Sequence, residues 1–305
     1  MTGNDSRFAD GPFSGRTLAE AWPVLPPEWA GTRKARNLAF PILVKFIFTE
    51  EKLSVQVHPD DDYASRHEIA AGGRGKTEMW YALRARPGAE VLVGLKPEIT
   101  RSSFEHAIAS GTAEHCLEHV PLRAGEAVFV PARTAHTIGP GLVLCEIQQN
   151  SDLTYRVYDY NRRDAQGRTR ELHIAKALDV LRFGKQMGGK IRPAQAARGP
   201  LTVTFLAACR YFATEKWDFA SPIRADSSPE HFDLLIFLEG SGALRWGQSG
   251  AEFGPAQVWL MPAALGRYEI VPASHASLLR SYVPGSLEEF AAGLPESERS
   301  RLVHP

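Results

Sequence analysis

The stretch GEAVFVPARTAH, residues 125–136, decides how this chain is organised. A glycine is followed after five residues by a proline and, after four more, by His136, so a short apolar strand ends at a turn that carries a histidine. AQVWLMPAALGR, residues 256–267, repeats this spacing, with alanine in place of the glycine and Arg267 in place of the histidine. A repeated pattern of this kind indicates internal duplication. We expect two similar units, the first built for chemistry and the second for support.

The rest of the sequence predicts a mainly β fold. Short apolar runs alternate with turn residues, as in a barrel or sandwich. In the first half these runs are residues 41–48, 52–57, 78–83, 90–95, 126–130 and 142–149. Helical spacing is found in three segments, residues 61–72, 100–111 and 172–183. Residues 184–200 are rich in glycine, proline and polar groups and are predicted to form a linker, after which the strand pattern resumes.

Composition excludes several classes of protein. The chain has 305 residues, 44% of them hydrophobic, and a formal net charge of zero without a basic run, so we expect no nucleic-acid partner. Cys116, Cys145 and Cys209 are widely spaced and odd in number, which predicts free buried thiols in a reducing compartment. The polar N-terminus lacks the features of a signal peptide, and the most apolar stretch is too short to cross a membrane. These features predict a soluble, cytoplasmic protein.

The stretch LSVQVHPDD, residues 53–61, places two metal-ligating side chain types on one strand face. Side chains alternate along a strand, so Gln56 and His58 point to the same side while the valines beside them point to the other. A polar face on an apolar strand looks either into water or into a pocket that needs polar atoms.

Longer motifs resemble a known family. The Gly-x5-Pro-x4-His pattern is the second half of the cupin signature. The stretches at 52–64, 75–83, 128–141, 146–162 and 209–219 resemble type I mannose-6-phosphate isomerases in their short prokaryotic form. The resemblance implies a mainly β fold of two cupin barrels in tandem with a few short helices. It implies a catalytic metal-binding domain over residues 1–195 and a cupin-like domain without a metal site over residues 196–305.

The resemblance also implies a metal site with one Zn²⁺ per chain, whose ligands fall on Gln56, His58, Glu78 and His136. Zinc accepts nitrogen and oxygen donors of these types, and a catalytic zinc keeps a position open for water or substrate.

Three further side chains match catalytic positions of the family. Lys76 and Arg156 would offer fixed positive charge to a phosphate and to a developing enediolate, and Glu146 would be a pocket carboxylate. The general base stays open between Glu146, a water linked to His58 and another pocket group.

The implied activity is the interconversion of mannose 6-phosphate and fructose 6-phosphate through an enediol, with a small sugar phosphate as the only partner besides a second copy of the chain. The chain is expected to be a monomer or a homodimer. Two alternatives are a metal-containing two-cupin protein that binds a sugar phosphate without turnover and an iron cupin dioxygenase, which uses a related ligand set.

Overall fold

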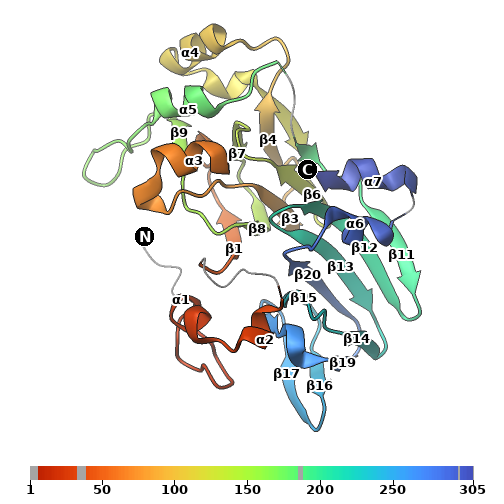
Figure 1. Cartoon of the computed structure of the whole chain (residues 1–305). Coiled ribbons are helices and arrows are strands. Elements are labelled where there is room, and N and C mark those ends of the chain that lie inside the picture. The colour runs from red at the N-terminus through yellow and green to blue at the C-terminus, as the bar shows by residue number, and fades with distance from the viewer. Residues whose placement is uncertain (1–5, 33–38, 185–187, 295, 305) are drawn as a thin grey trace. The chain divides into compact units, whose positions relative to one another are not determined.

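The computed structural model describes residues 6–32, 39–184, 188–294 and 296–304. Its contacts divide the chain into two compact units (Figure 1). We call Leu43–Ile191 the central unit, and Arg192–Pro305 together with Met1–Ile42 the C-terminal unit.

The N-terminal segment groups with the C-terminal unit, which differs from the expected first domain of residues 1–195. The physical reason is an aromatic cluster. The ring centroids of Trp22 and Phe40 lie 5.6 and 4.9 Å from that of Phe232, and all three side chains are buried. Such ring pairs stabilise a contact beyond the area they bury, so they hold this segment against Phe232, which directly precedes β15 (Asp233–Glu239) and lies about 200 residues away in sequence.

The central unit contains two antiparallel sheets that pack face to face, and their orders are β1-β8-β3-β6-β10 and β5-β4-β7-β2-β9. The strands are β1 (Ile42–Thr49), β2 (Val55–Val57), β3 (Glu78–Ala85), β4 (Glu90–Leu95), β5 (Leu117–Pro121), β6 (Ala127–Val130), β7 (His136–Ile138), β8 (Leu142–Gln149), β9 (Tyr155–Tyr158) and β10 (Gly189–Lys190). Trp80, Val93 and Val128 belong to one buried cluster built from strands of both sheets. The mainly β fold predicted from the sequence is therefore confirmed.

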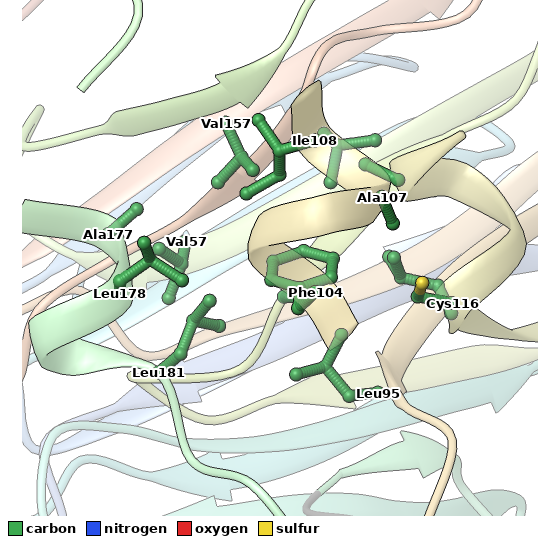
Figure 2. Close-up of a cluster of buried hydrophobic side chains, with 14 of the residues drawn as sticks. Val57, Leu95, Phe104, Ala107, Ile108, Cys116, Val157, Ala177, Leu178 and Leu181 are labelled. Atoms are coloured by element: carbon green, nitrogen blue, oxygen red, sulfur yellow. The ribbon is translucent and has the colours of Figure 1, made fainter. Parts of the chain in front are cut away.

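A second core covers the outer face of the β2–β9 sheet. The helices α4 (Arg101–Ala109) and α5 (Ile174–Val180) supply its other side, and Phe104 lies at its centre with Val57, Val157 and Leu181 around it (Figure 2). Because side chains alternate, burying Val55 and Val57 here turns Gln56 and His58 toward the barrel interior.

Two helices of the central unit begin where the sequence indicates, whereas α5 begins at Ile174, two residues after the predicted start. Thr100 caps α4 in a capping box with Ser103. Asp60 caps α3 (Asp61–His67) by accepting from the Tyr63 N–H at 2.9 Å, directly after the His58 turn. Short 3₁₀ turns follow these helices at Ile69–Ala71 and Ala113–Cys116.

The C-terminal unit also contains two sheets. Their orders are β11-β12-β13-β20-β15-β18, with β21 beside β12, and β14-β19-β16-β17. The strands are β11 (Ala194–Arg198), β12 (Leu201–Cys209), β13 (Ala213–Phe219), β14 (Ile223–Asp226), β15 (Asp233–Glu239), β16 (Gly242–Trp246), β17 (Ser249–Phe253), β18 (Val258–Met261), β19 (Arg267–Pro272), β20 (Ala276–Tyr282) and β21 (Val303–His304). The helical elements are α1 (Leu18–Ala21), α2 (Pro27–Ala30), α6 (Leu287–Ala292), α7 (Glu296–Leu302) and the 3₁₀ turns Trp22–Val24 and Ala263–Leu265.

The prediction of a linker over residues 184–200 is wrong in part. Positions 185–187 lie outside the described residues, and the rest of the segment contains two strands. β10 pairs with β6 and β11 pairs with β12, both antiparallel. These are edge strands, which use backbone hydrogen bonds and need few apolar side chains, so composition did not indicate them.

The three cysteines are free and buried, as predicted. Within the described residues, no helix combines the length and the apolar character needed to cross a membrane.

Candidate metal centre

Three of the four predicted ligands meet inside the central unit. One ligating atom from each of His58, Glu78 and His136 lies within 4.8 Å of the other two, and all three side chains are buried. Glu78 opens β3, His136 opens β7, and His58 follows β2, so strands of both sheets converge here. The described residues contain no other such group of three or more His, Cys, Asp or Glu side chains.

Both imidazoles are oriented by backbone carbonyls. Nδ1 of His58 donates to the carbonyl of Leu153 at 2.7 Å, and Nδ1 of His136 donates to that of Thr134 at 2.9 Å. Burial lowers the pKa of His136 to about 4 and places the pKa of His58 well below its usual range, so both rings are neutral near pH 7. Each Nε2 therefore carries a lone pair directed into the site, as in metal-binding histidines held by an outer partner.

Glu78 fits a cation at the same place. Its Oε1 is buried without a hydrogen-bond partner, although it lies 3.2 Å from Nε2 of His136. That contact joins two acceptors, because the imidazole is neutral and its proton is on Nδ1. A buried pair of acceptors is costly unless a positive charge lies between them. The orphaned oxygen and the two nitrogen lone pairs therefore fit a bound metal ion.

Gln56 lies beside His136 in the sheet. The two residues are register partners between β2 and β7, and Nε2 of Gln56 is 3.2 Å from Nε2 of His136. In this orientation the amide donates to the ring lone pair. A half-turn of the carboxamide presents its oxygen at the same position, and that oxygen can bind a cation.

Lys76 contacts two of these ligands. Its Nζ donates to Oε2 of Glu78 at 2.6 Å and lies 3.2 Å from Nε2 of His58. Burial opposes the charge, but the carboxylates of Glu78 and Glu146 outweigh it and raise the pKa of Lys76. The side chain is therefore a buried ammonium group at the edge of the ligand cluster.

Glu146 points into the same interior. Glu146 is the register partner of Trp80, and Trp80 follows Glu78 by two residues on β3. The carboxylates of Glu78 and Glu146 therefore lie on the same face of the sheet. Oε1 of Glu146 accepts from the indole N–H of Trp80 at 3.0 Å. Burial raises the pKa of Glu146, and the neighbouring Lys76 opposes that shift.

Arg156 completes a row across the second sheet. Gln56 is paired with His136 on one side and with Arg156 on the other, so the three side chains lie on one face. The guanidinium donates from Nε to the Ser54 hydroxyl at 3.3 Å and from Nη1 to the Glu171 carbonyl at 2.9 Å. It is partly buried and retains solvent access, as a group that meets an incoming ligand must.

Sequence reasoning missed Lys45, which lies at the same site. Its Nζ is 3.2 Å from Oε1 of Gln148, 3.1 Å from Asp152 and 3.9 Å from Oε2 of Glu146. A single lysine inside the apolar run 41–48 was the available signal, since a charge on such a strand needs a partner.

The comparisons with known proteins agree with this site. No family model matches the chain. Among curated proteins, it is 38% identical over 213 residues to the mannose-6-phosphate isomerase of Streptococcus mutans, covering 70% of this chain and 65% of that protein. It is 34% identical over 264 residues to mannose-6-phosphate isomerase ManA of Bacillus subtilis, covering 86% of this chain and 80% of that protein.

Among solved structures, the mannose 6-phosphate isomerase of Bacillus subtilis superimposes with a TM-score of 0.82 at 32% identity, over 90% of this chain and 85% of that one. The agreement extends over both units in sequence and in backbone. The chain belongs to the mannose-6-phosphate isomerase family.

Proposed function

We propose that this chain interconverts mannose 6-phosphate and fructose 6-phosphate. The observation that carries the proposal is the buried His58, Glu78 and His136 group, with two imidazole lone pairs and an unpaired carboxylate oxygen directed at one point. Membership of the family supports the choice of substrate.

We further propose that Gln56, His58, Glu78 and His136 hold one Zn²⁺. Two imidazole nitrogens, a carboxylate and an amide oxygen form a donor set that zinc accepts. When bound, the ion supplies Lewis acidity to a sugar oxygen near the reacting carbons.

The chain's own cations then have electrostatic roles. The reaction removes a proton from C2 of the aldose and delivers one to C1, while a hydroxyl proton passes from O2 to O1, so no atom is gained or lost. Negative charge develops on the oxygens of the enediol, and we assign its stabilisation to Lys76, because this side chain is a buried ammonium group beside the proposed ligands. We assign the dianionic phosphate to Arg156, because this guanidinium keeps solvent access.

Glu146 is our candidate for the proton-transfer group. A carboxylate accepts the proton from C2, and the resulting acid returns it to C1. The raised pKa that burial gives Glu146 makes it a stronger base than an exposed glutamate, which suits removal of a weakly acidic C–H proton.

Three expectations from the sequence stay proposals: the cytoplasm as the compartment, zinc as the resident metal, and a monomer or homodimer as the assembly. The substrate is expected to be a phosphosugar, and a panel of aldose phosphates would define its range.

The test couples fructose 6-phosphate formation to a dehydrogenase and compares native, chelator-treated and zinc-reconstituted protein. We expect turnover to fall on chelation and to return with the ion. Full turnover without metal would refute the metal-dependent mechanism. Binding of mannose 6-phosphate without any turnover would favour the binding-protein alternative.

A further inference from the structure

The C-terminal barrel repeats the strand register of the metal-binding barrel. In the central unit, Glu78 opens β3 and pairs with Val130, the residue just before the proline of the repeated motif. In the C-terminal unit, Asp233 opens β15 and pairs with Met261, which also directly precedes the motif proline. Asp233 therefore takes the place of the metal-ligating Glu78, with the carboxylate kept.

Two residues further along each strand, the charge is reversed. Trp80 on β3 pairs with Glu146, whereas Leu235 on β15 pairs with Arg280 on β20. Arg280 therefore takes the place of Glu146. The neighbouring strand reverses its charge as well, because Lys45 faces Glu146 at 3.9 Å and Glu215 faces Arg280 at 3.6 Å.

The pair formed by Gln56 and His136 is replaced in the same register. Asp226 on β14 pairs with Arg267 on β19, which holds the position of the motif histidine. Arg267 is exposed, and its Nε lies 3.4 Å from Oδ1 of Asp226, so neither side chain reaches the barrel interior as a ligand.

Two carboxylates and two aromatic rings surround the Arg280 guanidinium. Its Nε donates to Oδ2 of Asp233 at 3.0 Å, and its Nη1 lies 3.6 Å from Oε2 of Glu215. The guanidinium carbon is 4.5 Å from the ring centroid of Tyr282 and 5.5 Å from that of Trp217. Only 15% of the arginine side chain is exposed, against 1% and 5% for the two carboxylates.

Two buried carboxylates cannot both stay ionised without a compensating cation. In the central unit the carboxylates share lysines and the proposed metal ion. In the C-terminal unit, side chains surround the carboxylates: Arg280 contacts both of them, and the His231 ring lies 3.3 Å from Asp233. We propose that the Arg280 guanidinium is the resident cation of the C-terminal barrel, held in a site for a planar cation formed by Asp233, Glu215, Tyr282 and Trp217, so that this barrel needs no metal ion.

The chemistry of the site selects a guanidinium over a metal ion or an ammonium group. A planar cation with donors along its edge can reach two carboxylates at once and also lie against aromatic rings. The site therefore accepts small guanidinium compounds once the arginine side chain is removed.

The test is chemical rescue of Arg280→Ala. We expect the variant to melt about 10 °C below the wild type, since two buried carboxylates lose their partner. Millimolar methylguanidinium chloride should restore several degrees of this loss. Neutral methylurea, which has a similar shape, and sodium chloride should not. Arg245→Ala is the matched control, because Arg245 lies in the same barrel, is 61% exposed and faces Glu269 at 4.0 Å. The melting temperatures of the control and the wild type should not change with any of the three additives.

An Arg280→Ala protein as stable as the control, or one rescued equally by methylurea, would overturn the proposal. If Arg280→Ala does not fold, Arg280→Met and Arg280→Lys decide. The lysine variant should be the more stable of the two, and a methionine variant that melts with the wild type refutes a required cation. These melting temperatures do not depend on isomerase turnover, so this inference and the proposed function can fail separately.

Discussion

Replacing Glu78 by glutamine removes one negative charge from the metal centre and keeps the shape of the side chain. In the wild type, Oε1 is unpaired 3.2 Å from Nε2 of His136, and Oε2 accepts from Lys76 at 2.6 Å. A glutamine amide can donate to the His136 lone pair. In the variant, the glutamine N–H therefore occupies the His136 lone pair that a metal ion would bind.

Two effects of this substitution can be given magnitudes. Partners that merely orient metal ligands are worth about 10–100-fold in metal affinity, so loss of a charged ligand should weaken binding by at least about 100-fold, or about 2.7 kcal/mol. In metal-free protein, Lys76 loses its nearest carboxylate while fully buried. Breaking such a pair costs about 3 kcal/mol, which lowers the melting temperature by about 6–12 °C.

The assay measures bound zinc after dialysis, the isomerase rate, and the melting temperature in chelator. The matched control is Glu215→Gln, a buried carboxylate of the C-terminal barrel that faces Arg280. The control should lose stability but retain zinc and rate, whereas Glu78→Gln should lose all three. A Glu78→Gln protein with wild-type zinc content and rate would remove Glu78 from the ligand set and refute the proposed metal site.

Three further predictions concern other parts of the chain. Lys76→Met should retain bound zinc but lose about 100-fold or more in turnover, because it removes one fixed charge from the developing enediolate; unchanged turnover would assign Lys76 a purely structural role. The two ring nitrogens of His231 lie 3.3 Å from Asp233 and 3.3 Å from Glu289, and the ring is stacked on Tyr282 near Arg280. Burial lowers the pKa of His231, but the hydrogen bond and charge of Asp233 outweigh burial, so the pKa is raised. The contribution of His231 to stability is complete below the ordinary histidine pKa of about 6.5 and is lost as the pH rises through the raised value. Above about pH 6.5, urea midpoints should thus decline less steeply with rising pH in His231→Gln than in the wild type, and parallel declines would exclude the imidazolium. Phe104→Ala should cost about 3–5 kcal/mol in urea unfolding, because the ring is fully buried among α4, α5 and β9; the control Phe48→Ala, whose residue is 72% exposed, should stay within about 0.5 kcal/mol.

The sequence predicted best those elements whose pattern is set by their own side chains. The runs at 90–95 and 142–149 are β4 and β8 with the same bounds, because both strands are largely buried and contain an apolar run, Val91–Val93 in β4 and Leu142–Cys145 in β8. Strands held mainly by backbone hydrogen bonds, such as β10 and β11, carry no such pattern, so the sequence predicts a linker there.

The residue types of the site could be predicted from the sequence, but the contacts between strands that are distant in sequence could not. Motifs indicated Gln56, Glu78 and His136 as neighbours, and the register places Gln56 opposite His136. Lys45 and Trp80 could not be assigned to the site, because their contacts with Glu146 arise from pairing between strands distant in sequence. The grouping of Trp22 with Phe232 has the same origin, since long-range packing leaves no local periodicity.

Charge balance explains why the two barrels, built on one register, differ in what they can bind. In the central unit, the carboxylates of Glu78 and Glu146 are matched by the ammonium groups of Lys76 and Lys45, and both histidines are neutral. The interior is thus neutral by itself, and a divalent ion adds two positive charges that a dianionic sugar phosphate can compensate. In the C-terminal barrel, the two carboxylates of Asp233 and Glu215 face one guanidinium, that of Arg280, and the His231 ring, when protonated, supplies the second positive charge 3.3 Å from Asp233. The proposed metal ion would be exchangeable and keep open coordination positions, and Arg156 retains solvent access, whereas the Arg280 guanidinium is enclosed by its own partners and stabilises the fold without offering a position to a ligand.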